Sequence, residues 1–231
     1  AGLVSVLSAA CGEKILQTSV PEALFIADEQ DSHISDIVLN RSYSAIAVGP
    51  GLGRHEETAR AFYKLLGQIK RPIVLDADAL NLLAGHTELI ENLPKNSILT
   101  PHHLEFDRLF GKNDTSYERL NKAREIAIRY HIIIVLKGAN TAIVTPKGDV
   151  LFNSSGNAGM ATAGSGDTLT GMITGLLAQG YHPIPAAILG VFLHGTAGDL
   201  AAERDSQEYI TAGDIISQIG QAYKKLHNYR V

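Results

Sequence analysis

The amino-acid sequence predicts an α/β fold with a mostly parallel central sheet, and three observations carry this prediction. Short β-branched runs alternate with stretches in which apolar residues recur at helical spacing. Several of the β-branched runs are apolar on both faces, which is typical of strands covered by helices from two sides. The length of 231 residues suits one large α/β domain better than two small ones. We therefore expect a single domain over residues 1–231.

Six strands are expected in the first part of the chain. They cover residues 3–7, 23–27, 45–48, 73–76, 97–100 and 132–136. Apolar residues at helical spacing predict helices near residues 59–69 and 120–130, between these strands. Strands and helices that alternate in this way predict parallel strands joined by right-handed crossovers.

The pattern changes after the sixth strand. Residues 141–145 and 150–153 flank the turn sequence Pro-Lys-Gly-Asp at 146–149, which predicts a C-terminal β-hairpin. Beyond the hairpin we expect helices only. Residues 171–179 and 186–202 are apolar and rich in Gly and Ala, and Thr211 and Asp214 form a capping-box variant before the last helix.

Composition argues against several classes of protein. The net charge of −4 leaves no broad basic field for nucleic acid. No apolar run reaches the length of a bilayer span, and the apolar residues 1–10 lack a basic leader, so we expect no membrane association. The single cysteine, Cys11, fits a reducing cytoplasm. His102 and His103 lie beside Glu105, but adjacent histidines rarely point the same way, and no metal site is predicted.

The strongest chemical signal is Gly164-Ser165-Gly166-Asp167, directly before an apolar helical stretch. Glycines let the backbone approach a ligand, and the N–H groups at a helix start favour an anion such as phosphate. Asp167 falls in the first turn, where the same field favours the carboxylate, which would orient or deprotonate a substrate hydroxyl. The alternative is a first-turn aspartate with packing glycines. The motif matches neither a Walker P-loop nor a dinucleotide fingerprint.

A second candidate loop, Lys137 to Thr141, follows the apolar strand at 132–136. Loops at the carboxyl ends of parallel strands are where α/β sheets bind ligands. Lys137 would reach a nucleotide phosphate, while Thr141 and the backbone of Gly138 would offer hydrogen bonds. The alternative is a plain loop with a solvated lysine.

Three further loops fall at strand ends, and their sequences span residues 49–53, 76–81 and 100–105. Each has a structural explanation: turn glycines in the first, Asp78 as a helix N-cap in the second, and Glu105 in a first helical turn in the third. Their placement at one edge, with the two loops above, nevertheless predicts a cleft.

Five ordered motifs together resemble those of the ADP/ATP-dependent NAD(P)H-hydrate dehydratases. They are Gly-Pro-Gly-Leu-Gly at 49–53, Asp-Ala-Asp-Ala-Leu-Asn at 76–81, Thr-Pro-His at 100–102, Lys-Gly-Ala-Asn-Thr at 137–141 and the glycine-rich segment 159–167. The resemblance implies a ribokinase-like three-layer α/β/α sandwich. It also implies nucleotide-dependent dehydration of hydrated NADH and NADPH, with release of AMP and phosphate where ADP is used. The alternatives are a small-molecule kinase of the same fold and a nucleotide-binding module without catalysis.

The resemblance also implies roles for individual residues. Asp167 is expected to be catalytic and, with Gly51, Gly53 and His102, to face the hydrated cofactor. Supporting roles fall to Asp78, Asn81, Glu105 and Asn157. The residues expected at the adenine nucleotide are Lys137, Gly138, Ala139, Asn140, Thr141, Gly164, Ser165 and Gly166.

The family further implies Mg²⁺, a homotetramer and a fused or separate NAD(P)HX epimerase. Its members normally have a strand, a glycine-rich turn and a helix before the segment that matches residue 1, and this sequence is expected to lack them.

Overall fold

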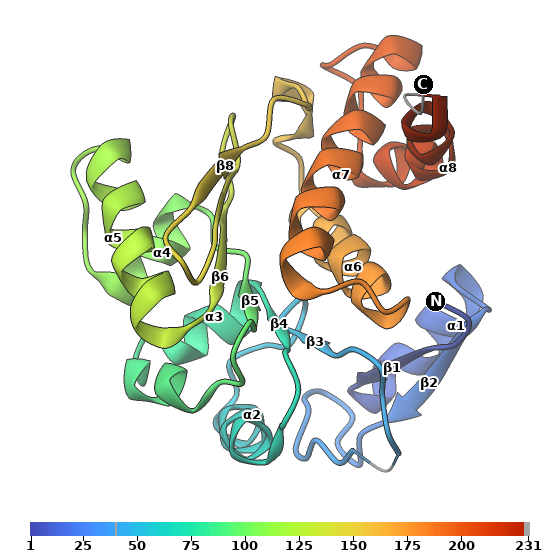
Figure 1. The fold of residues 1–231 in the computed structure, drawn as a ribbon. Coiled ribbons are helices and arrows are strands. Elements are labelled where there is room, and N and C mark those ends of the chain that lie inside the picture. The colour runs from blue at the N-terminus through green and yellow to red at the C-terminus, as the bar shows by residue number, and fades with distance from the viewer. Residues whose placement is uncertain (40, 229–231) are drawn as a thin grey trace.

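The structure is a computed structural model that describes residues 1–39 and 41–228. Within these residues the central sheet has six strands, in the order β3-β4-β5-β6-β7-β8, and the first four are parallel (Figure 1). The last two form the antiparallel hairpin expected from the turn at 146–149. The strands are β3 (Ala47–Val48), β4 (Val74–Leu75), β5 (Ile98–Leu99), β6 (Ile133–Leu136), β7 (Ala142–Val144) and β8 (Val150–Phe152).

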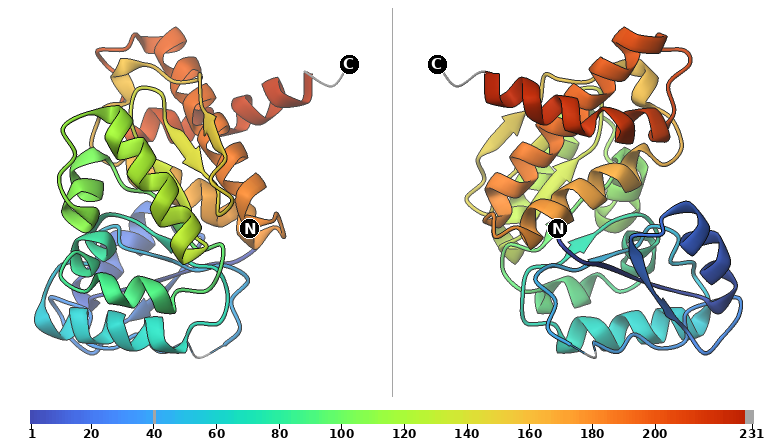
Figure 2. Two further views of the ribbon diagram at one scale, coloured as in Figure 1. Left: turned by 60° about the vertical axis from the view of Figure 1, so that its left-hand side comes forward. Right: turned by 90° about the vertical axis from the view of Figure 1, so that its right-hand side faces the viewer.

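Helices cover both faces of this sheet and give the expected three layers (Figures 1 and 2). One face carries α2 (Glu56–Gln68), α3 (Ala77–Leu83), α4 (His103–Phe110) and α5 (Ser116–Tyr130); the other carries α6 (Ser165–Ala178) and α7 (Pro183–Asp205). Strands β3 to β6 are neighbours in chain order, and right-handed crossovers between such strands pass over one face. The helices that follow the hairpin cover the other face.

Alternation along the strands divides the core between the two layers. In β6 and the residue before it, Ile132 and Ile134 pack with α2 to α5, whereas Ile133 and Val135 pack with α6 and α7. All four side chains are fully buried, because the strand lies between two helical layers. The strand is apolar on both faces because helices cover both faces, as the sequence predicted.

The last helix, α8 (Ala212–Asn228), packs on α7 through a third apolar cluster that includes Leu193, Ala197 and Ile215. Its start confirms the capping prediction. The Thr211 hydroxyl donates to Asp214 Oδ2 at 2.6 Å, and the Thr211 N–H donates to the same oxygen at 2.9 Å.

The first two strands lie outside the central sheet. β1 (Val4–Ser8) and β2 (Ala23–Ala27) pair in parallel with each other, and a 3-10 turn (Ala10–Gly12) and α1 (Glu13–Ser19) connect them. The described residues between β2 and β3 form no further strand. The strand predictions were therefore right in position, but only four of the six strands expected before the hairpin lie in the central sheet.

Several boundaries differ from the sequence predictions. Helices α3 and α4 begin within segments taken as loops, whereas α6 begins at Ser165, within the glycine-rich motif expected at its start. Two more 3-10 segments, Thr87–Asn92 and Ala158–Met160, precede β5 and α6.

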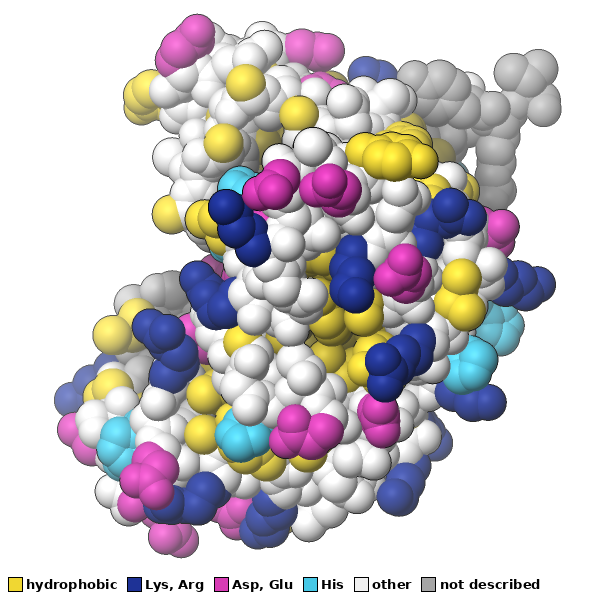
Figure 3. All heavy atoms as spheres, turned by 90° about the vertical axis from the view of Figure 1, so that its left-hand side faces the viewer, with side chains coloured by type: hydrophobic (Ala, Val, Ile, Leu, Met, Phe, Trp, Pro, Cys, Tyr) yellow, Lys and Arg dark blue, Asp and Glu magenta, His cyan; other side chains and the backbone are white. Residues whose placement is uncertain are grey.

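Helix α7 is long and apolar enough to cross a bilayer, contrary to expectation, but 61% of its most apolar window is buried inside the protein. Core helices of proteins commonly have this length and composition. On the face that carries α4 and α5, Lys and Arg side chains are intermixed with Asp and Glu (Figure 3).

Candidate active site

The candidate loops meet at the carboxyl ends of the parallel strands, as the sequence predicted. A single bridge between His102 and Lys137 extends the β5–β6 pairing to the loops beyond these strands. The Gly53 N–H donates to Asp78 Oδ2 at 3.1 Å, which joins the loop after β3 to the residues after β4. Neighbouring parallel strands end at the same edge of a sheet, and this brings together segments far apart in sequence.

Asp76 links three of the segments at this edge. Its side chain is 1% exposed and accepts hydrogen bonds from Lys137 Nζ at 2.7 Å and from Thr170 Oγ1 at 2.7 Å. Lys137 follows β6 and Thr170 lies in α6, so the carboxylate connects the sheet edge to the glycine-rich helix. A buried carboxylate needs such partners, because its removal from water is otherwise costly.

Lys137 is held in place and is not the solvated lysine of the alternative interpretation. Its side chain is 19% exposed, and Nζ also lies 3.8 Å from Glu105 Oε2. A Cβ atom at Gly166 would lie 3.1 Å from Nζ, so the ammonium group sits beside the first turn of α6. An ammonium group has three N–H donors, and Asp76 takes one of them at a normal hydrogen-bond distance.

The loop after β3 depends on a glycine at its first position. Gly49 has φ of +137°, and a Cβ there would lie 1.8 Å from the Asp76 carbonyl oxygen. No other residue type fits that approach. Ala77, the next residue after Asp76, has φ of +46°, which is uncommon for a residue with a side chain. The backbone is therefore strained beside the buried carboxylate.

Helix α6 begins without a cap. Gly164 has φ of +82°, and no side chain accepts from the first N–H groups of the helix. Within residues 1–39 and 41–228, the N–H groups of Gly166 and Asp167 have no acceptor, whereas those of Ser165 and Thr168 bond to backbone carbonyls. Unsatisfied donors at a helix start attract anions. The geometry thus has the features expected of a phosphate site.

Asp167 is exposed in the first turn of α6, and its carboxylate has no hydrogen-bond or ion-pair partner among the described residues. The pKa of this carboxyl is raised, first because neighbouring atoms partly remove it from water and then because Asp76 is negative, while Lys137 acts in the opposite direction. The helix field favours the carboxylate, as expected from the first-turn position, whereas partial burial and the negative charge of Asp76 favour the protonated acid.

His102 and Glu105 close the start of α4. His102 Nδ1 accepts from the N–H groups of Leu104 at 3.1 Å and Glu105 at 3.3 Å, and Glu105 Oε2 accepts from the His102 N–H at 2.8 Å. These bonds place the proton of the neutral ring on Nε2. Burial lowers the pKa of His102; Lys137 lowers it further, although Glu105 opposes them. Glu105 lies in the first turn, as expected.

Ser165 is positioned by a buried histidine of α7. Its hydroxyl lies 3.3 Å from His194 Nε2, and burial lowers the pKa of His194 to about 4. The ring is therefore neutral near pH 7 and can exchange one hydrogen bond with the hydroxyl. His194 of α7 thus contacts the first residue of α6.

Asp78 and Asn81 lie in α3 and shape the loop at residues 49–53. Asp78 accepts from Gly53 N–H and from Asn81 Nδ2, the latter at 3.2 Å, and Asn81 Oδ1 accepts from Arg108. Asp78 is not the N-cap proposed from the sequence; Asp76 holds that position, without a side-chain cap bond. Gly51 has φ of +64° and remains exposed.

Some of the predicted site residues make no hydrogen bond to Asp76, Lys137 or the first turn of α6. Gly138 and Thr141 close their own turn through the Thr141 hydroxyl, and Ala139 and Asn140 lie exposed within it. Asn157 Nδ2 instead donates to Asp199 Oδ1 of α7 at 3.0 Å, which fixes the segment before α6.

Sequence reasoning did not select Asp76 or Thr170 as site residues. Asp76 directly follows a fully apolar strand, and a carboxylate at that position was the available signal. Thr170 gave none, because its contact with Asp76 spans 94 positions. Two surface hollows, of about 330 Å³ at Gln179–Pro185 and about 220 Å³ at residues 39–72, lie away from this edge, so the cleft stays a prediction.

Comparisons with known proteins agree with this arrangement. A family model described as NAD(P)H-hydrate dehydratase matches residues 1–221. The bifunctional NAD(P)H-hydrate repair enzyme Nnr of Moorella thermoacetica is 41% identical over 217 residues, which cover 92% of this chain and 41% of that enzyme. The chain thus spans less than half the length of this relative.

Solved structures share the fold. The ADP/ATP-dependent NAD(P)H-hydrate dehydratase of Bacillus subtilis, co-crystallised with ATP/Mg²⁺ and soaked with CoA, aligns with a TM-score of 0.83 and 31% identity over 97% of this chain and 81% of that one. A ribokinase-like superfamily protein of Enterococcus faecalis aligns with a TM-score of 0.77 and 27% identity over 97% and 78% of the two chains. The chain belongs to the NAD(P)H-hydrate dehydratase family and has its ribokinase-like fold.

Proposed function

We propose that this family member uses ADP or ATP to dehydrate hydrated NADH and NADPH and so restores the reduced cofactors. One observation carries the proposal: two unsatisfied N–H groups, at Gly166 and Asp167, lie beside an unpartnered carboxylate and the ammonium group of Lys137. Phosphoryl transfer needs charge neutralisation and in-line positioning more than covalent chemistry, and these groups supply both.

The two substrates would approach this point from different loops. We assign the adenine nucleotide to the loop at 137–141 and the first turn of α6, with Gly164, Ser165 and Gly166 at its phosphates. We assign the hydrated nicotinamide to Gly51, Gly53, His102 and Asp167. His102 supports this placement, because its ring is partly exposed at this edge, with Nδ1 capping α4 and Nε2 3.5 Å from Glu105 Oε1.

In the first step, the hydroxyl oxygen of the hydrated ring bonds to the terminal phosphorus of the nucleotide, and Asp167 accepts the hydroxyl proton. The bond from that phosphorus to the bridging oxygen breaks, and AMP leaves when ADP is used. In the second step, the carbon–oxygen bond to the phosphate breaks and the neighbouring ring carbon loses a proton. This elimination forms the carbon–carbon double bond and releases phosphate.

Mg²⁺ fits these residues in one respect. Among the carboxylates at the edge, Asp167 has no partner in the part of the chain that the structure describes, whereas Asp76 is taken by Lys137 and Thr170. Magnesium sites often use one or two carboxylates together with substrate phosphates. The ion, held by Asp167 and the nucleotide, would neutralise charge on the transferred phosphoryl group.

The test mixes the protein with hydrated NADH, ADP and Mg²⁺ and follows the absorbance band of NADH. We expect the band to recover, with one AMP and one phosphate for each NADH formed. A stable phosphorylated alcohol without recovery of NADH would instead favour the small-molecule kinase. Nucleotide binding without any turnover would favour a binding module.

We further propose a homotetramer in the cytoplasm that works with an epimerase for hydrated NAD(P)H, fused or separate. Exposed apolar side chains on β8, α8 and the preceding loop, such as Phe152, Tyr209 and Ile216, support self-association. The single cysteine supports a reducing compartment. The word "bifunctional" in the name of the Moorella thermoacetica relative, and its greater length, support the epimerase.

A further inference from the structure

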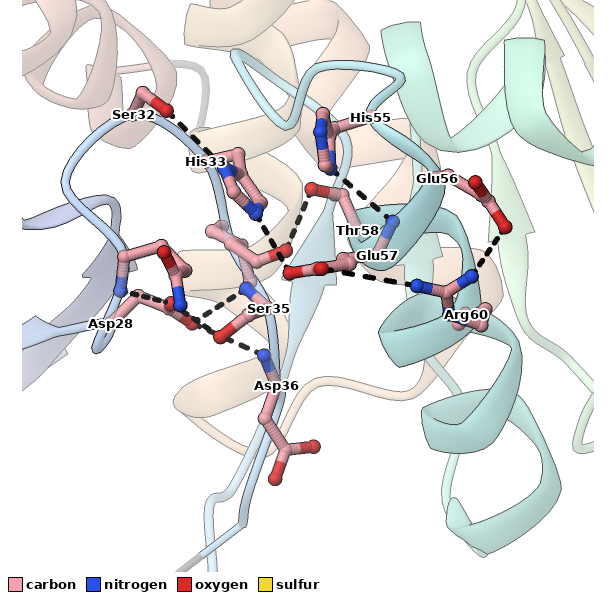
Figure 4. A network of polar contacts seen from close by, with 12 residues as sticks. Asp28, Ser32, His33, Ser35, Asp36, His55, Glu56, Glu57, Thr58 and Arg60 are labelled. Atoms are coloured by element: carbon pink, nitrogen blue, oxygen red, sulfur yellow. Dashed lines mark hydrogen bonds and ion pairs between the residues drawn. The ribbon is translucent and has the colours of Figure 1, made fainter.

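Three potential metal ligands gather at the start of α2, outside the proposed active site. His33 comes from the segment after β2, His55 is the residue before α2, and Glu57 lies in the first turn of α2. One ligand atom from each residue lies within 4.8 Å of the others (Figure 4). No other group of three such residues occurs at this spacing in the described part of the chain.

The segment that presents His33 is held in a defined shape. Asp28 is 7% exposed, and its carboxylate accepts from the N–H and the hydroxyl of Ser35, both at 2.8 Å, and from Gln30 N–H at 2.9 Å. The buried Thr58 of α2 donates its hydroxyl to the Ile34 carbonyl at 2.7 Å. Because these bonds tie the segment to itself and to α2, His33 is positioned before any ligand arrives.

His33 has partners for both ring nitrogens. Nε2 lies 2.9 Å from Glu57 Oε2, and Nδ1 lies 3.3 Å from Ser32 Oγ. A serine hydroxyl can donate or accept, so the ring proton can move to Nδ1 and leave the Nε2 lone pair for a metal. Metal-binding histidines usually have such a partner on the other nitrogen, because it fixes the ring and its tautomer.

His55 is the adjustable member of the cluster. It is exposed, and its ring stacks on that of His33 with centroids 3.8 Å apart. Its Nδ1 accepts from Glu57 N–H over a long distance of 3.3 Å. A neutral ring that binds a metal through either nitrogen loses this acceptor, so binding requires the ring to turn and to release the cap bond.

Glu57 supplies the negative charge. Its Oε2 faces His33, while Oε1 lies 4.0 Å from Arg60 Nη2, at the limit of an ion pair (Figure 4). The carboxylate therefore keeps one oxygen directed toward the two imidazole rings. A cation between them would be paired with one full negative charge.

We propose that His33, His55 and Glu57 bind one divalent transition-metal ion of the Zn²⁺ type, with water as the fourth ligand. Two imidazole nitrogens and one carboxylate suit zinc, whereas magnesium and calcium prefer oxygen ligands. Ligand atoms on one tetrahedral zinc lie about 3.4 Å apart, given bonds of about 2.1 Å. The His33–Glu57 distance must open slightly, and the turn of the exposed His55 closes the largest separation.

The bound ion would join the segment at 28–36 to the start of α2. Since His55 follows Gly53 by two positions, the ion would also steady the end of the loop at 49–53. Its role is therefore structural, and it neither replaces Mg²⁺ nor requires the proposed reaction.

The experiment titrates the untagged, chelator-treated protein with Zn²⁺ by calorimetry, without nucleotide. The variants are His33→Gln and His55→Asn; asparagine keeps a side chain that can cap α2. The control is His86→Gln, because exposed His86 pairs with Glu88 at 3.2 Å but belongs to no group of three among the described residues. Circular dichroism checks that each variant is folded.

We expect one equivalent of Zn²⁺ on the wild type, a loss of affinity of at least about tenfold in both test variants, and no change in the control. Zn²⁺ should also raise the Tm of the wild type and of the control, but not that of His33→Gln. The proposal is overturned if the wild type binds no zinc, if either test variant binds it as well as the wild type, or if the control weakens equally. Failure of the dehydratase assay would leave this result unaffected.

Discussion

Helices α4 and α6 begin at the same edge of the sheet, but their first turns are built in opposite ways. At α4, His102 and Glu105 satisfy the first N–H groups through a reciprocal capping box. At α6, Gly164 offers no side chain, and the N–H groups of Gly166 and Asp167 have no acceptor among the described residues.

The difference separates the support of a fold from the binding of a ligand. A helix start left open at the edge of a sheet is available to an external ligand, because its first N–H groups are not taken by a side chain. The surroundings point the same way, since Lys137 lies next to the open start and Asp76 holds Lys137 there. A phosphate would take the position that a capping side chain occupies at α4.

The strongest test of the open start is Asp167→Asn, which keeps the shape of the side chain but removes the base. We expect kcat/KM for dehydration to fall at least about 100-fold, while ADP affinity measured by calorimetry changes little. The matched control is Glu56→Gln, an exposed first-turn carboxylate of α2. Near-normal turnover in Asp167→Asn would show that the carboxylate takes no part in the reaction.

Gly164→Ala tests the backbone of the same turn. An alanine at φ of +82° is strained, and its Cβ would lie 3.1 Å from that of Ala212, so we expect a loss of about 1–2 kcal/mol in the free energy of unfolding. Gly171→Ala, further along α6 in open space, should raise stability by about 0.5–1 kcal/mol. Urea unfolding of both variants measures the contrast, and equal effects would argue against strain at residue 164.

The closed start is tested by two substitutions of His102. His102→Ala should cost about 1 kcal/mol of stability because the cap of α4 is lost, and His102→Asn should recover most of it. If His102 also touches the hydrated cofactor, KM rises in both variants. A normal KM in His102→Asn would limit the residue to capping.

The smallest effect concerns pH. The raised pKa of Asp167 predicts that activity is lost, as pH falls, at a higher pH than for an ordinary aspartate, because the base must be ionised. Asp76→Asn removes a neighbouring negative charge and leaves Lys137 less neutralised, and both changes favour the Asp167 carboxylate. The acid limb of the kcat/KM profile should therefore move to lower pH. If the acid limb of the kcat/KM profile does not move in Asp76→Asn, the group that titrates there is not Asp167.

Much of this architecture could be predicted from the order of the residues. The β-branched runs placed the eight strands of the described residues, since side-chain period and turn chemistry are local properties. The glycine-rich motif placed the start of α6 correctly, because a left-handed glycine before an apolar helix is also a local feature. The short helices α3 and α4 entered only as alternative explanations for Asp78 and Glu105, because their starts lie in the segments taken for loops at the strand ends.

Contacts between distant segments could not be predicted in this way. The sequence singled out Asp167 and Lys137, but only the folded chain set Asp76 between Lys137 and Thr170 and raised the pKa of Asp167. His33 and Glu57 likewise meet across 24 positions with no shared motif. Local sequence sets backbone geometry and the charge of each group, whereas burial and the distances between charges depend on which strands become neighbours, and only tertiary packing decides that.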